Sequence, residues 1–433
     1  MCSQMKINTR LVAARTLVRV LENGQSLTTA LEHTLASVEN PQDKAFVQAV
    51  CFGVCRYYHR LQFILMQLLD KPMKDSEIYA LALVGLYQLA FMRVKEHAAV
   101  SETVFATQKK LWAKSLINAI LRRYLREKDA IELSINDNPV ALHSHPKWLI
   151  SRIENDWGKD TAAHIFQANN EAPPMMLRVN NLKNTREDYL AQLAALDIEA
   201  QAVDTHPCAI HLIKPIGVGA LPHFAQGAVS VQDTAAQFAA GLLSLEAGHR
   251  VLDLCAAPAG KTAHILESQP DVQCVAVDID ALRMLRVETN LARLNLSATL
   301  IVGDATEPKT WWDGVLFDRI LVDAPCSAIG VIRRHPDIKL LRRETDLSAL
   351  PDLQYAILNA AWSMLEKGGL LVYATCSILK AENEHQIARF LSENADAKEI
   401  PFHLDNNPAK HGWQILTGTQ NYDGFYYARL RKI

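Results

Sequence analysis

Residues 251–262 read Val251-Leu252-Asp253-Leu254-Cys255-Ala256-Ala257-Pro258-Ala259-Gly260-Lys261-Thr262, an apolar strand that runs through a turn of small residues into a helix. Small residues in such a turn let backbone N–H groups and the helix N-terminus approach an anionic or polar ligand. A nucleotide P-loop needs a glycine where Cys255 stands, and a dinucleotide fingerprint needs three glycines where only Gly260 is present. The turn therefore predicts a cofactor loop in an α/β domain and disfavours NTPases and dehydrogenases.

The chain around this turn alternates strand-like and helical segments from Asp233 onward. The helical segments have lengths that suit right-handed crossovers, so we expect a Rossmann-like, doubly wound parallel sheet in a domain of residues 233–433. A hairpin at 413–416 and 424–430 is expected to close the sheet. The strand-like runs are 250–254, 273–277, 299–302, 319–322 and 370–374.

Acidic residues follow the second and third of these strands. Asp278 stands 18 residues after Gly260, where a carboxylate can bind both hydroxyls of an adenosine ribose. Asp304 follows the third strand, where a side chain could meet the adenine amino group. Either aspartate alone could equally be a helix cap. Together with the loop, their order and spacing favour S-adenosylmethionine over other nucleosides.

Two cysteines stand just past the last two strands of the series, in Asp323-Ala324-Pro325-Cys326 and Thr375-Cys376-Ser377. The carboxyl ends of parallel strands share one edge of a sheet, so the two thiols are expected to be near neighbours. A pair of thiols suits addition to C6 of a cytosine, methylation at C5 and elimination. Asp323 is placed to hydrogen-bond the N3/N4 edge of the ring. The alternative for an isolated cysteine is a structural role.

A basic loop, Arg333-Arg334-His335-Pro336, follows the first cysteine. Its charge suits a grip on substrate phosphates, and the alternative is a solvated turn. The same two alternatives hold for Arg122, Arg123 and Arg126, which lie on successive turns of a predicted helix.

The first part of the chain has a helical pattern almost throughout, with no strand alternation. We expect an all-helical domain over residues 1–140 and a small α/β connecting module over 141–232. Within the helices, Cys51 and Cys55 are one turn apart and most simply buried.

The composition is that of a globular protein, with 49% hydrophobic and 21% charged residues. The longest apolar run, Ala80 to Phe91, is too short for a bilayer, and Met1 to Arg10 lacks the apolar core of a signal peptide. We therefore expect a cytoplasmic protein. The eight cysteines form neither a disulfide framework nor a metal-ligand cluster, so no metal is expected.

The net charge of −2 argues against a uniformly basic nucleic-acid coat. The first 145 residues carry 18 lysines and arginines against 13 aspartates and glutamates, a surplus that permits an RNA surface without demanding one.

At these motifs the sequence resembles the RNA 5-methylcytosine methyltransferases of the Fmu/Sun family, and its helical first third resembles NusB. The resemblance implies a class I S-adenosylmethionine-dependent methyltransferase domain behind an all-α NusB-like domain and a connecting module. It implies Cys376 as the nucleophile and Cys326 as the thiol that assists release of the product. The cofactor residues it implies are Cys255, Ala256, Ala257, Pro258, Ala259, Gly260, Lys261, Asp278, Arg283, Asp304 and Asp323.

The same resemblance implies 16S rRNA or an early small-subunit assembly intermediate as the partner, bound by a monomer. The NusB-like domain and the Arg178-Val179-Asn180 region are implied to help hold RNA. One departure is visible: Ala328-Ile329 stands where the family usually has Gly-Thr, which stiffens and enlarges a loop beside the target base.

Two alternatives stay open. The first keeps the chemistry and changes the substrate to tRNA. The second is a non-catalytic RNA-binding assembly or antitermination factor, which the intact set of Asp323, Cys326 and Cys376 disfavours.

Overall fold

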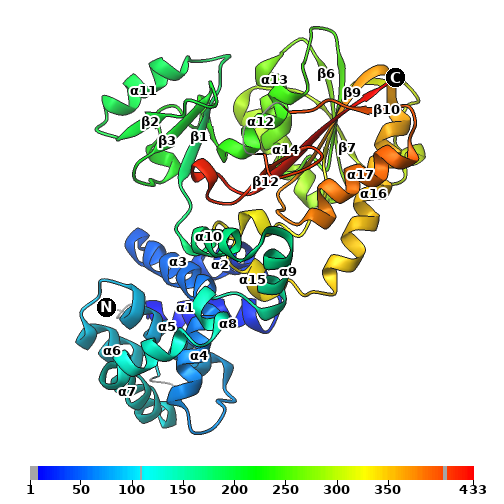
Figure 1. Cartoon of the computed structure of the whole chain (residues 1–433). Coiled ribbons are helices and arrows are strands. Elements are labelled where there is room, and N and C mark those ends of the chain that lie inside the picture. The colour runs from blue at the N-terminus through cyan, green and yellow to red at the C-terminus, as the bar shows by residue number, and fades with distance from the viewer. Residues whose placement is uncertain (1–7, 108–109, 403–406) are drawn as a thin grey trace. The chain divides into compact units, whose positions relative to one another are not determined.

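The computed structural model describes residues 8–107, 110–402 and 407–433 and divides the chain into two compact units. Unit 1 comprises Met1–Glu171 with Ile332–Glu344, and unit 2 comprises Ala172–Val331 with Thr345–Ile433 (Figure 1). The first seven residues, on which the expectation of no signal peptide partly depends, lie outside the described residues. No helix in the described part of the chain is long and apolar enough to cross a bilayer.

Unit 1 is helical, which confirms the prediction of an all-α first domain. Polar side chains begin several helices by accepting their first free N–H groups, as Asn8, Asn40 and Asp75 do. Helix α5 is apolar on all sides and lies in the centre of the core. The helices are α1 (Thr9–Leu21), α2 (Leu27–Leu35), α3 (Pro41–Arg56), α4 (Tyr58–Leu68), α5 (Ser76–Phe91), α6 (Glu96–Phe105), α7 (Trp112–Ile135), α8 (Pro139–His143), α9 (Lys147–Trp157), α10 (Lys159–Asn170) and α15 (Ile338–Leu341).

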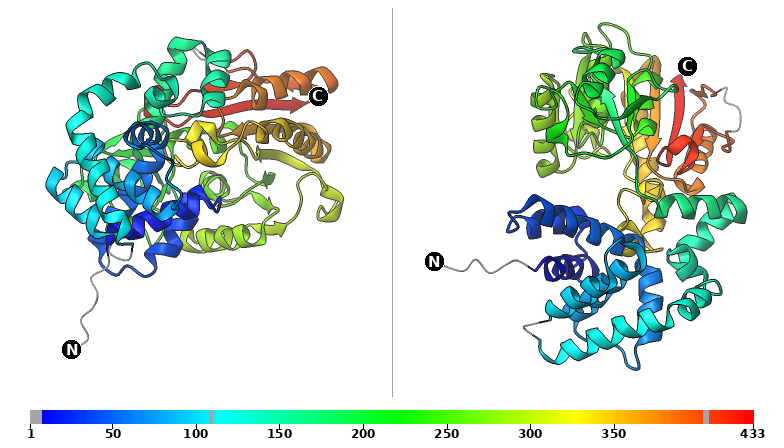
Figure 2. Two further views of the ribbon diagram at one scale, coloured as in Figure 1. Left: turned by 90° about the horizontal axis from the view of Figure 1, so that it is seen from below. Right: turned by 90° about the vertical axis from the view of Figure 1, so that its left-hand side faces the viewer.

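The segment 332–344, which the sequence places in the C-terminal domain, packs with the helices of unit 1 and carries α15 (Figure 2, yellow). Lys339 is fully buried there and donates to the carbonyl of Arg56 and to the side chain of Asn170. Asp337 accepts the N–H of Leu27 at the start of α2. Burial, together with the charge of Arg56, lowers the pKa of Lys339 well below its ordinary value.

Arg333 lies at the start of this segment. Neither alternative for the basic loop, a grip on substrate phosphates or a solvated turn, is therefore correct for Arg333. Its side chain is only 1% exposed, and its carbonyl accepts a hydrogen bond from Arg56 of unit 1. The pattern of basic residues carried no signal for this burial.

Unit 2 is built on one large sheet with the strand order β10-β12-β9-β8-β5-β6-β7. The five strands from β9 to the edge strand β7 are parallel, and β12 runs antiparallel beside β9. This confirms the predicted doubly wound sheet and its closing hairpin of β11 and β12. The strands are β5 (Arg250–Leu254), β6 (Gln273–Asp278), β7 (Thr299–Val302), β8 (Phe317–Asp323), β9 (Leu365–Thr375), β10 (Ala397–Glu399), β11 (Trp413–Ile415) and β12 (Phe425–Lys432).

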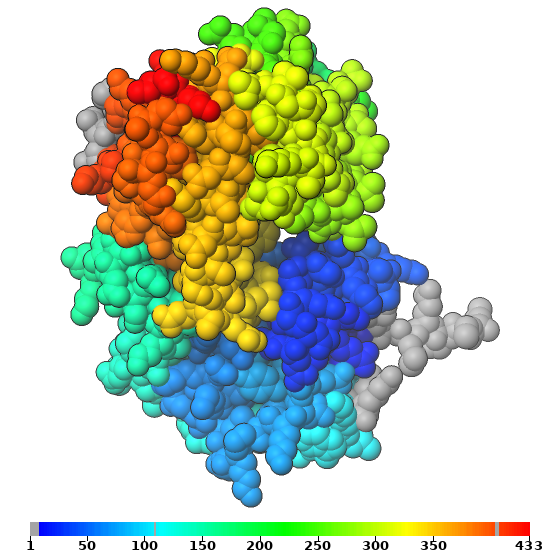
Figure 3. Space-filling view, turned by 90° about the vertical axis from the view of Figure 1, so that its right-hand side faces the viewer, coloured from blue at the N-terminus to red at the C-terminus, as the bar shows by residue number. Residues whose placement is uncertain are grey.

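Alternate residues of these strands enter two different cores, as the pleat requires. Val251 and Leu321 pack against α12 (Thr234–Leu242), α13 (Gly260–Ser268) and α14 (Ala281–Leu294). Leu252 and Ile320 pack on the opposite face against α16 (Asp346–Met364) and α17 (Glu384–Glu393). Helices α16 and α17 lie side by side on the face that Figure 3 shows in yellow and orange.

A second, smaller sheet precedes the large one in unit 2. It lies in the part of the chain where the sequence predicts a small α/β module. Its strand order is β2-β3-β1-β4, with all pairs antiparallel. The elements are β1 (Met175–Val179), α11 (Arg186–Ala194), β2 (Ala200–Ala202), β3 (Ala209–Leu212) and β4 (Val229–Val231).

Candidate active site

The predicted site residues lie at the carboxyl edge of the large sheet. Cys255 follows β5, Asp278 ends β6, Asp304 comes two residues after β7, Asp323 ends β8 and Cys376 follows β9. The strand order places β5 beside β8, which is the point where the order of a doubly wound sheet reverses. Ligands of such sheets bind at this crevice.

The loop from Cys255 to Lys261 is shaped by backbone conformation and by one acidic side chain. Cys255 and Ala259 have positive φ angles of 62° and 78°, which bend the chain sharply between β5 and α13. Asp278 accepts the N–H of Ala257 at 3.1 Å. No side chain caps the N-terminus of α13, so its first N–H groups face the edge without a capping oxygen.

Arg283 contacts both the loop and Asp278. It donates to the carbonyl of Ala257 at 2.9 Å and lies 3.4 Å from a carboxylate oxygen of Asp278. The helix that carries it begins at Asp280, whose side chain caps α14. Arg283 therefore braces the loop and the acid together.

Asp304 is partly exposed and is held by a local turn. Its Oδ1 accepts both the N–H and the hydroxyl of Thr306, at 2.8 and 2.7 Å. Trp311 donates its indole N–H to the carbonyl of Asp304, which fixes the loop after β7.

Lys261 and Asp323 form an ion pair of 2.6 Å between the loop and the end of β8. Burial alone would lower the pKa of Lys261, but the charge of Asp323 and the bond between them raise it above its ordinary value. The ammonium group also lies 5.3 Å from the centre of the Phe425 ring. The site therefore holds a fixed positive charge beside the carboxylate.

Asp253 lies beneath this pair and is fully buried. It accepts the hydroxyl of Thr262 at 2.6 Å. Burial raises the pKa of Asp253 to about 7, although the bond from Thr262 acts in the opposite direction.

The two thiols meet, as the sequence predicts. The Sγ atoms of Cys326 and Cys376 are 3.3 Å apart, although 50 residues separate them in the chain. The hydrogen bond with Cys376 and burial raise the pKa of Cys326 well above its ordinary value. The protonated form of Cys326 is therefore favoured.

The loops that carry the thiols are also joined through the backbone. Gly330 donates its N–H to the carbonyl of Cys376 at 3.0 Å, and its own carbonyl accepts the N–H of Gly424 at 2.8 Å. A Cβ at Gly330 would overlap the carbonyl oxygen of Gly424 and lie 2.8 Å from that of Cys376. Only glycine fits this contact.

The backbone of Ala328, which stands where the family usually has glycine, is strained in this loop. Ala328 has a φ of 60°, in the left-handed region that favours glycine. The substitution therefore constrains the backbone two residues beyond Cys326. The thiol pair is nevertheless intact.

Two groups near the site were missed. Glu382 receives hydrogen bonds from the serine that follows each cysteine. The signal that could have found it is the serine after each cysteine, with one acid shortly downstream. Arg178 is buried and forms a two-pronged ion pair with Glu267 while donating to the carbonyl of Gly260. The Arg178 side chain therefore braces the start of α13, and the expectation that the Arg178-Val179-Asn180 region helps hold RNA stays a prediction.

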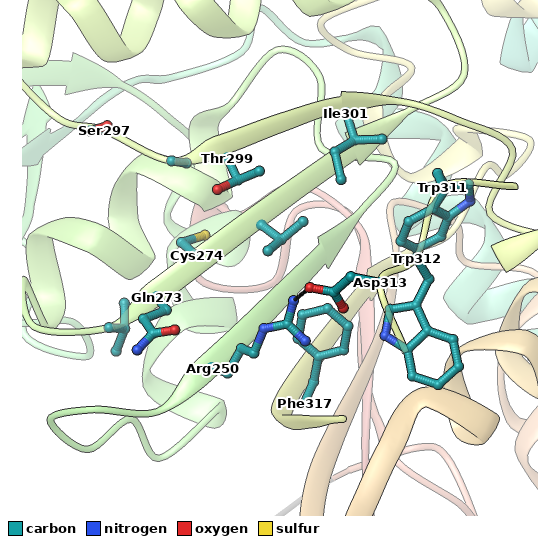
Figure 4. Close-up of a pocket in the computed structure, with 13 residues that line it drawn as sticks. Arg250, Gln273, Cys274, Ser297, Thr299, Ile301, Trp311, Trp312, Asp313 and Phe317 are labelled. Atoms are coloured by element: carbon teal, nitrogen blue, oxygen red, sulfur yellow. Dashed lines mark hydrogen bonds and ion pairs between the residues drawn. The ribbon is translucent and has the colours of Figure 1, made fainter. Parts of the chain in front are cut away.

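A cavity of about 450 Å³ lies away from this edge, along the starts of β5 to β8 (Figure 4). Arg250 pairs there with Asp313 at 2.6 Å and stacks over Phe317. None of the predicted site residues line it. Among the described residues there is no group of three or more His, Cys, Asp and Glu that could hold a metal ion.

Comparison with known proteins decides the family. The chain is 47% identical to Ribosomal RNA small subunit methyltransferase B of Pasteurella multocida, over 99% of this chain and 96% of that protein. The protein of the same name from Vibrio cholerae is 46% identical, over 100% and 99% of the two chains. The chain belongs to the 16S rRNA methyltransferase RsmB/F family.

The family signatures cover most of the chain. The signature described as 16S rRNA methyltransferase RsmB/F matches residues 240–431, that of the RsmF/B-like ferredoxin-like domain matches 145–219, and that of the NusB family matches 7–126. They agree with the predicted NusB-like, connecting and methyltransferase folds.

Solved structures show the same fold. The crystal structure of PH0851 is similar with a TM-score of 0.83 at 23% identity, covering 99% of this chain and 100% of that one. NSun6 from Pyrococcus horikoshii, solved with SFG, has a TM-score of 0.61 at 21% identity, covering 67% and 99%.

Replacing Gly330 tests the contact between the thiol loops. We expect Gly330→Ala to lower the free energy of unfolding by about 1–3 kcal/mol, because the new methyl group must push two carbonyl groups apart. Urea denaturation measures this change. Gly217→Ala is the matched control, since a Cβ there meets no atom within 4 Å. Equal stability of the two variants would contradict the packing.

The buried Asp253 predicts a pH dependence of stability. Its folded pKa of about 7 exceeds the ordinary value, so between about pH 4 and pH 7 the folded state keeps a proton that the unfolded state has lost. Its contribution to the free energy of unfolding is full below about pH 4 and falls as the pH rises toward 7.

Asp253→Asn removes this titration. The wild type should therefore lose stability relative to the variant between about pH 4 and about pH 7, as urea denaturation would show. The exposed Asp271→Asn should show no such trend. A difference between wild type and Asp253→Asn that is flat with pH would rule out the raised pKa.

Proposed function

We propose that this chain transfers a methyl group from S-adenosylmethionine to C5 of a cytosine in 16S rRNA, with Cys376 as the nucleophile. The observation that carries the proposal is the pair of thiols 3.3 Å apart at the carboxyl edge of a methyltransferase sheet. Relatives named Ribosomal RNA small subunit methyltransferase B, which match the chain from end to end, support the substrate.

The residues of the edge fit the cofactor. The N-terminus of α13, which Ala259 cannot cap, suits the carboxylate of the methionine part, and the loop of Cys255 to Gly260 has only small side chains beside it. Asp278 and Asp304 are placed for the ribose and the adenine, while Arg283 and Asp323 border the same crevice. S-adenosylmethionine, when bound, supplies an electrophilic methyl group.

Cys376 begins the reaction on the base. Its thiolate adds to C6 of the cytosine, which breaks the aromatic system and makes C5 nucleophilic enough to accept the methyl group. Lys261 lies close enough for its ammonium charge to attract this thiolate. Asp323, a carboxylate paired with Lys261, orients the N3/N4 edge by accepting a hydrogen bond from the N4 amino group, and the Lys261 ammonium offsets the negative charge that develops on the ring.

Cys326 acts at the end of the reaction. Once C5 carries the methyl group, its proton passes to water and the bond between C6 and Cys376 breaks, which releases the product; the departing sulfur takes the proton of Cys326, and Cys326 regains a proton from the solvent. The protonated form of Cys326 is favoured, and its Sγ is 3.3 Å from the sulfur that departs. It is therefore placed to assist this elimination by proton transfer.

Unit 1 is the part that we assign to RNA. Arg122 and Arg126 are exposed on α7, although Arg122 bonds to Asn118 and Arg126 pairs with Glu127. Both can turn from these surface partners to phosphates, because exposed ion pairs contribute little. We propose that the chain works as a monomer in the cytoplasm, on 16S rRNA or on an early small-subunit assembly intermediate.

The experiment is methyl transfer from labelled S-adenosylmethionine to unmodified 16S rRNA, with tRNA as the competing substrate. Cys376→Ala should reduce transfer to rRNA by about a thousandfold or more, because the covalent route is lost. Cys208→Ala, a buried cysteine of the small sheet, is the control and should retain activity. Transfer to tRNA alone would overturn the substrate, and binding of rRNA without transfer to any RNA would favour the non-catalytic factor.

Cys326→Ala tests the second thiol separately. Because elimination slows while addition continues, we expect a covalent complex between RNA and Cys376 to accumulate, seen as a slowly migrating band that ribonuclease removes. A gel without this band, at normal RNA binding, would contradict the release role.

A further inference from the structure

A single buried carboxylate joins the two loops that carry the thiols. Glu382 is 1% exposed and lies after the second thiol, at the N-terminal side of α17. The hydroxyl groups of Ser327 and Ser377 both donate to its Oε2. These serines directly follow Cys326 and Cys376, so one acid contacts both loops at the residue next to the sulfur.

The other oxygen of Glu382 is also held. Its Oε1 accepts the N–H of Ser327 at 2.8 Å and the amide of Gln354 at 3.0 Å. The carbonyl of Glu382 accepts the hydroxyl of Tyr373, a residue of β9, at 2.8 Å. Among the described residues no lysine or arginine forms an ion pair with this carboxylate. It is therefore stabilised by neutral donors whose positions it fixes in return.

The neighbouring Asn383 secures the second loop from the other side. It accepts the hydroxyl of Thr375 at 2.6 Å and donates to the carbonyl of Ser377 at 2.9 Å. Loop 375–377 is thus held by two consecutive residues, and of these two Glu382 also bonds to the loop of Cys326, alongside the direct contacts of Ser327 with Ser377 and of Gly330 with Cys376.

We infer that Glu382 is a positioning residue, which ties the Cys326 loop to the Cys376 loop and holds the two sulfur atoms at the separation that product release needs. The role in product release rests on the proposed function. The clamp, by which we mean the hydrogen bonds of Glu382 to Ser327 and Ser377, concerns only this chain. Removing the carboxylate takes away the one acceptor that Ser327 and Ser377 share, and with it the bond from the Ser327 N–H. The loops then separate or rotate.

A negative charge in this position also acts on Cys326. Together with the larger effects of the Cys376 contact and burial, the charge of Glu382 raises the pKa of Cys326. The clamp thus favours the protonated form of the thiol that assists release.

The first test measures the separation of the thiols without RNA or S-adenosylmethionine. Diamide converts two close thiols to a disulfide: two S–H bonds break, one S–S bond forms, and two electrons and two protons pass to diamide, which becomes a hydrazine. From 3.3 Å, the sulfurs need to approach only to about 2.05 Å. The readout is the rate at which the linked Cys326 and Cys376 peptides appear by mass spectrometry, divided by the alkylation rate of each thiol with iodoacetamide.

We expect Glu382→Ala to slow this normalised rate by about tenfold or more, and Ser327→Ala and Ser377→Ala to slow it less. Glu384→Ala is the matched control, because Glu384 lies two residues away and bonds to Lys410 instead. A rate for Glu382→Ala within about twofold of wild type would overturn the clamp. If Glu382→Ala does not fold, the two serine variants are used instead, and disulfide formation within about twofold of the wild-type rate in both would overturn the clamp.

The second test uses methyl transfer to unmodified 16S rRNA. Glu382→Ala should lower kcat and accumulate the covalent RNA complex, with KM for S-adenosylmethionine unchanged, and Glu382→Gln should restore part of kcat. A raised KM for S-adenosylmethionine without accumulated complex would mean general damage and would overturn the positioning role. The diamide test contains no substrate. Its result therefore stands even if 16S rRNA is not the substrate.

Discussion

The parallel register of β8 with β9 is the constraint on which the rest of the site depends. Asp323 stands opposite Ala374, and the N–H of Ala324 reaches the carbonyl of Ala374 at 2.9 Å. Each cysteine comes two or three residues beyond this last pair, so the strands deliver both thiols to the same point. A shift of one residue would send the side chains of one strand to the opposite face of the sheet. The pairing of β8 with β9 therefore determines that the two thiols meet.

The two thiols have neighbours of opposite charge. Lys261, paired with Asp323, places positive charge near Cys376. Glu382 places negative charge near Cys326, in a pocket where neutral donors alone hold it. This asymmetry matches the division of the proposed reaction into an attack and a release.

Much of this arrangement could be predicted from sequence because it follows local rules. The strand-like runs at 250–254 and 299–302 have the boundaries of β5 and β7, and the ends of the parallel strands place Cys326 beside Cys376. The burial of Arg178 and of segment 332–344 could not be predicted, because the partners are distant in sequence. A basic residue has the same local pattern whether it faces solvent, RNA or a buried glutamate.

The most direct test of the central claim is to trap the intermediate and identify the sulfur it is bound to. An RNA substrate with 5-fluorocytosine at the target position should accept the attack and the methyl group but resist elimination, because C5 then has no proton to lose. Digestion with ribonuclease and protease, followed by mass spectrometry, locates the modified cysteine. The account predicts a nucleotide on the peptide of Cys376, and a nucleotide on the peptide of Cys326 would contradict it.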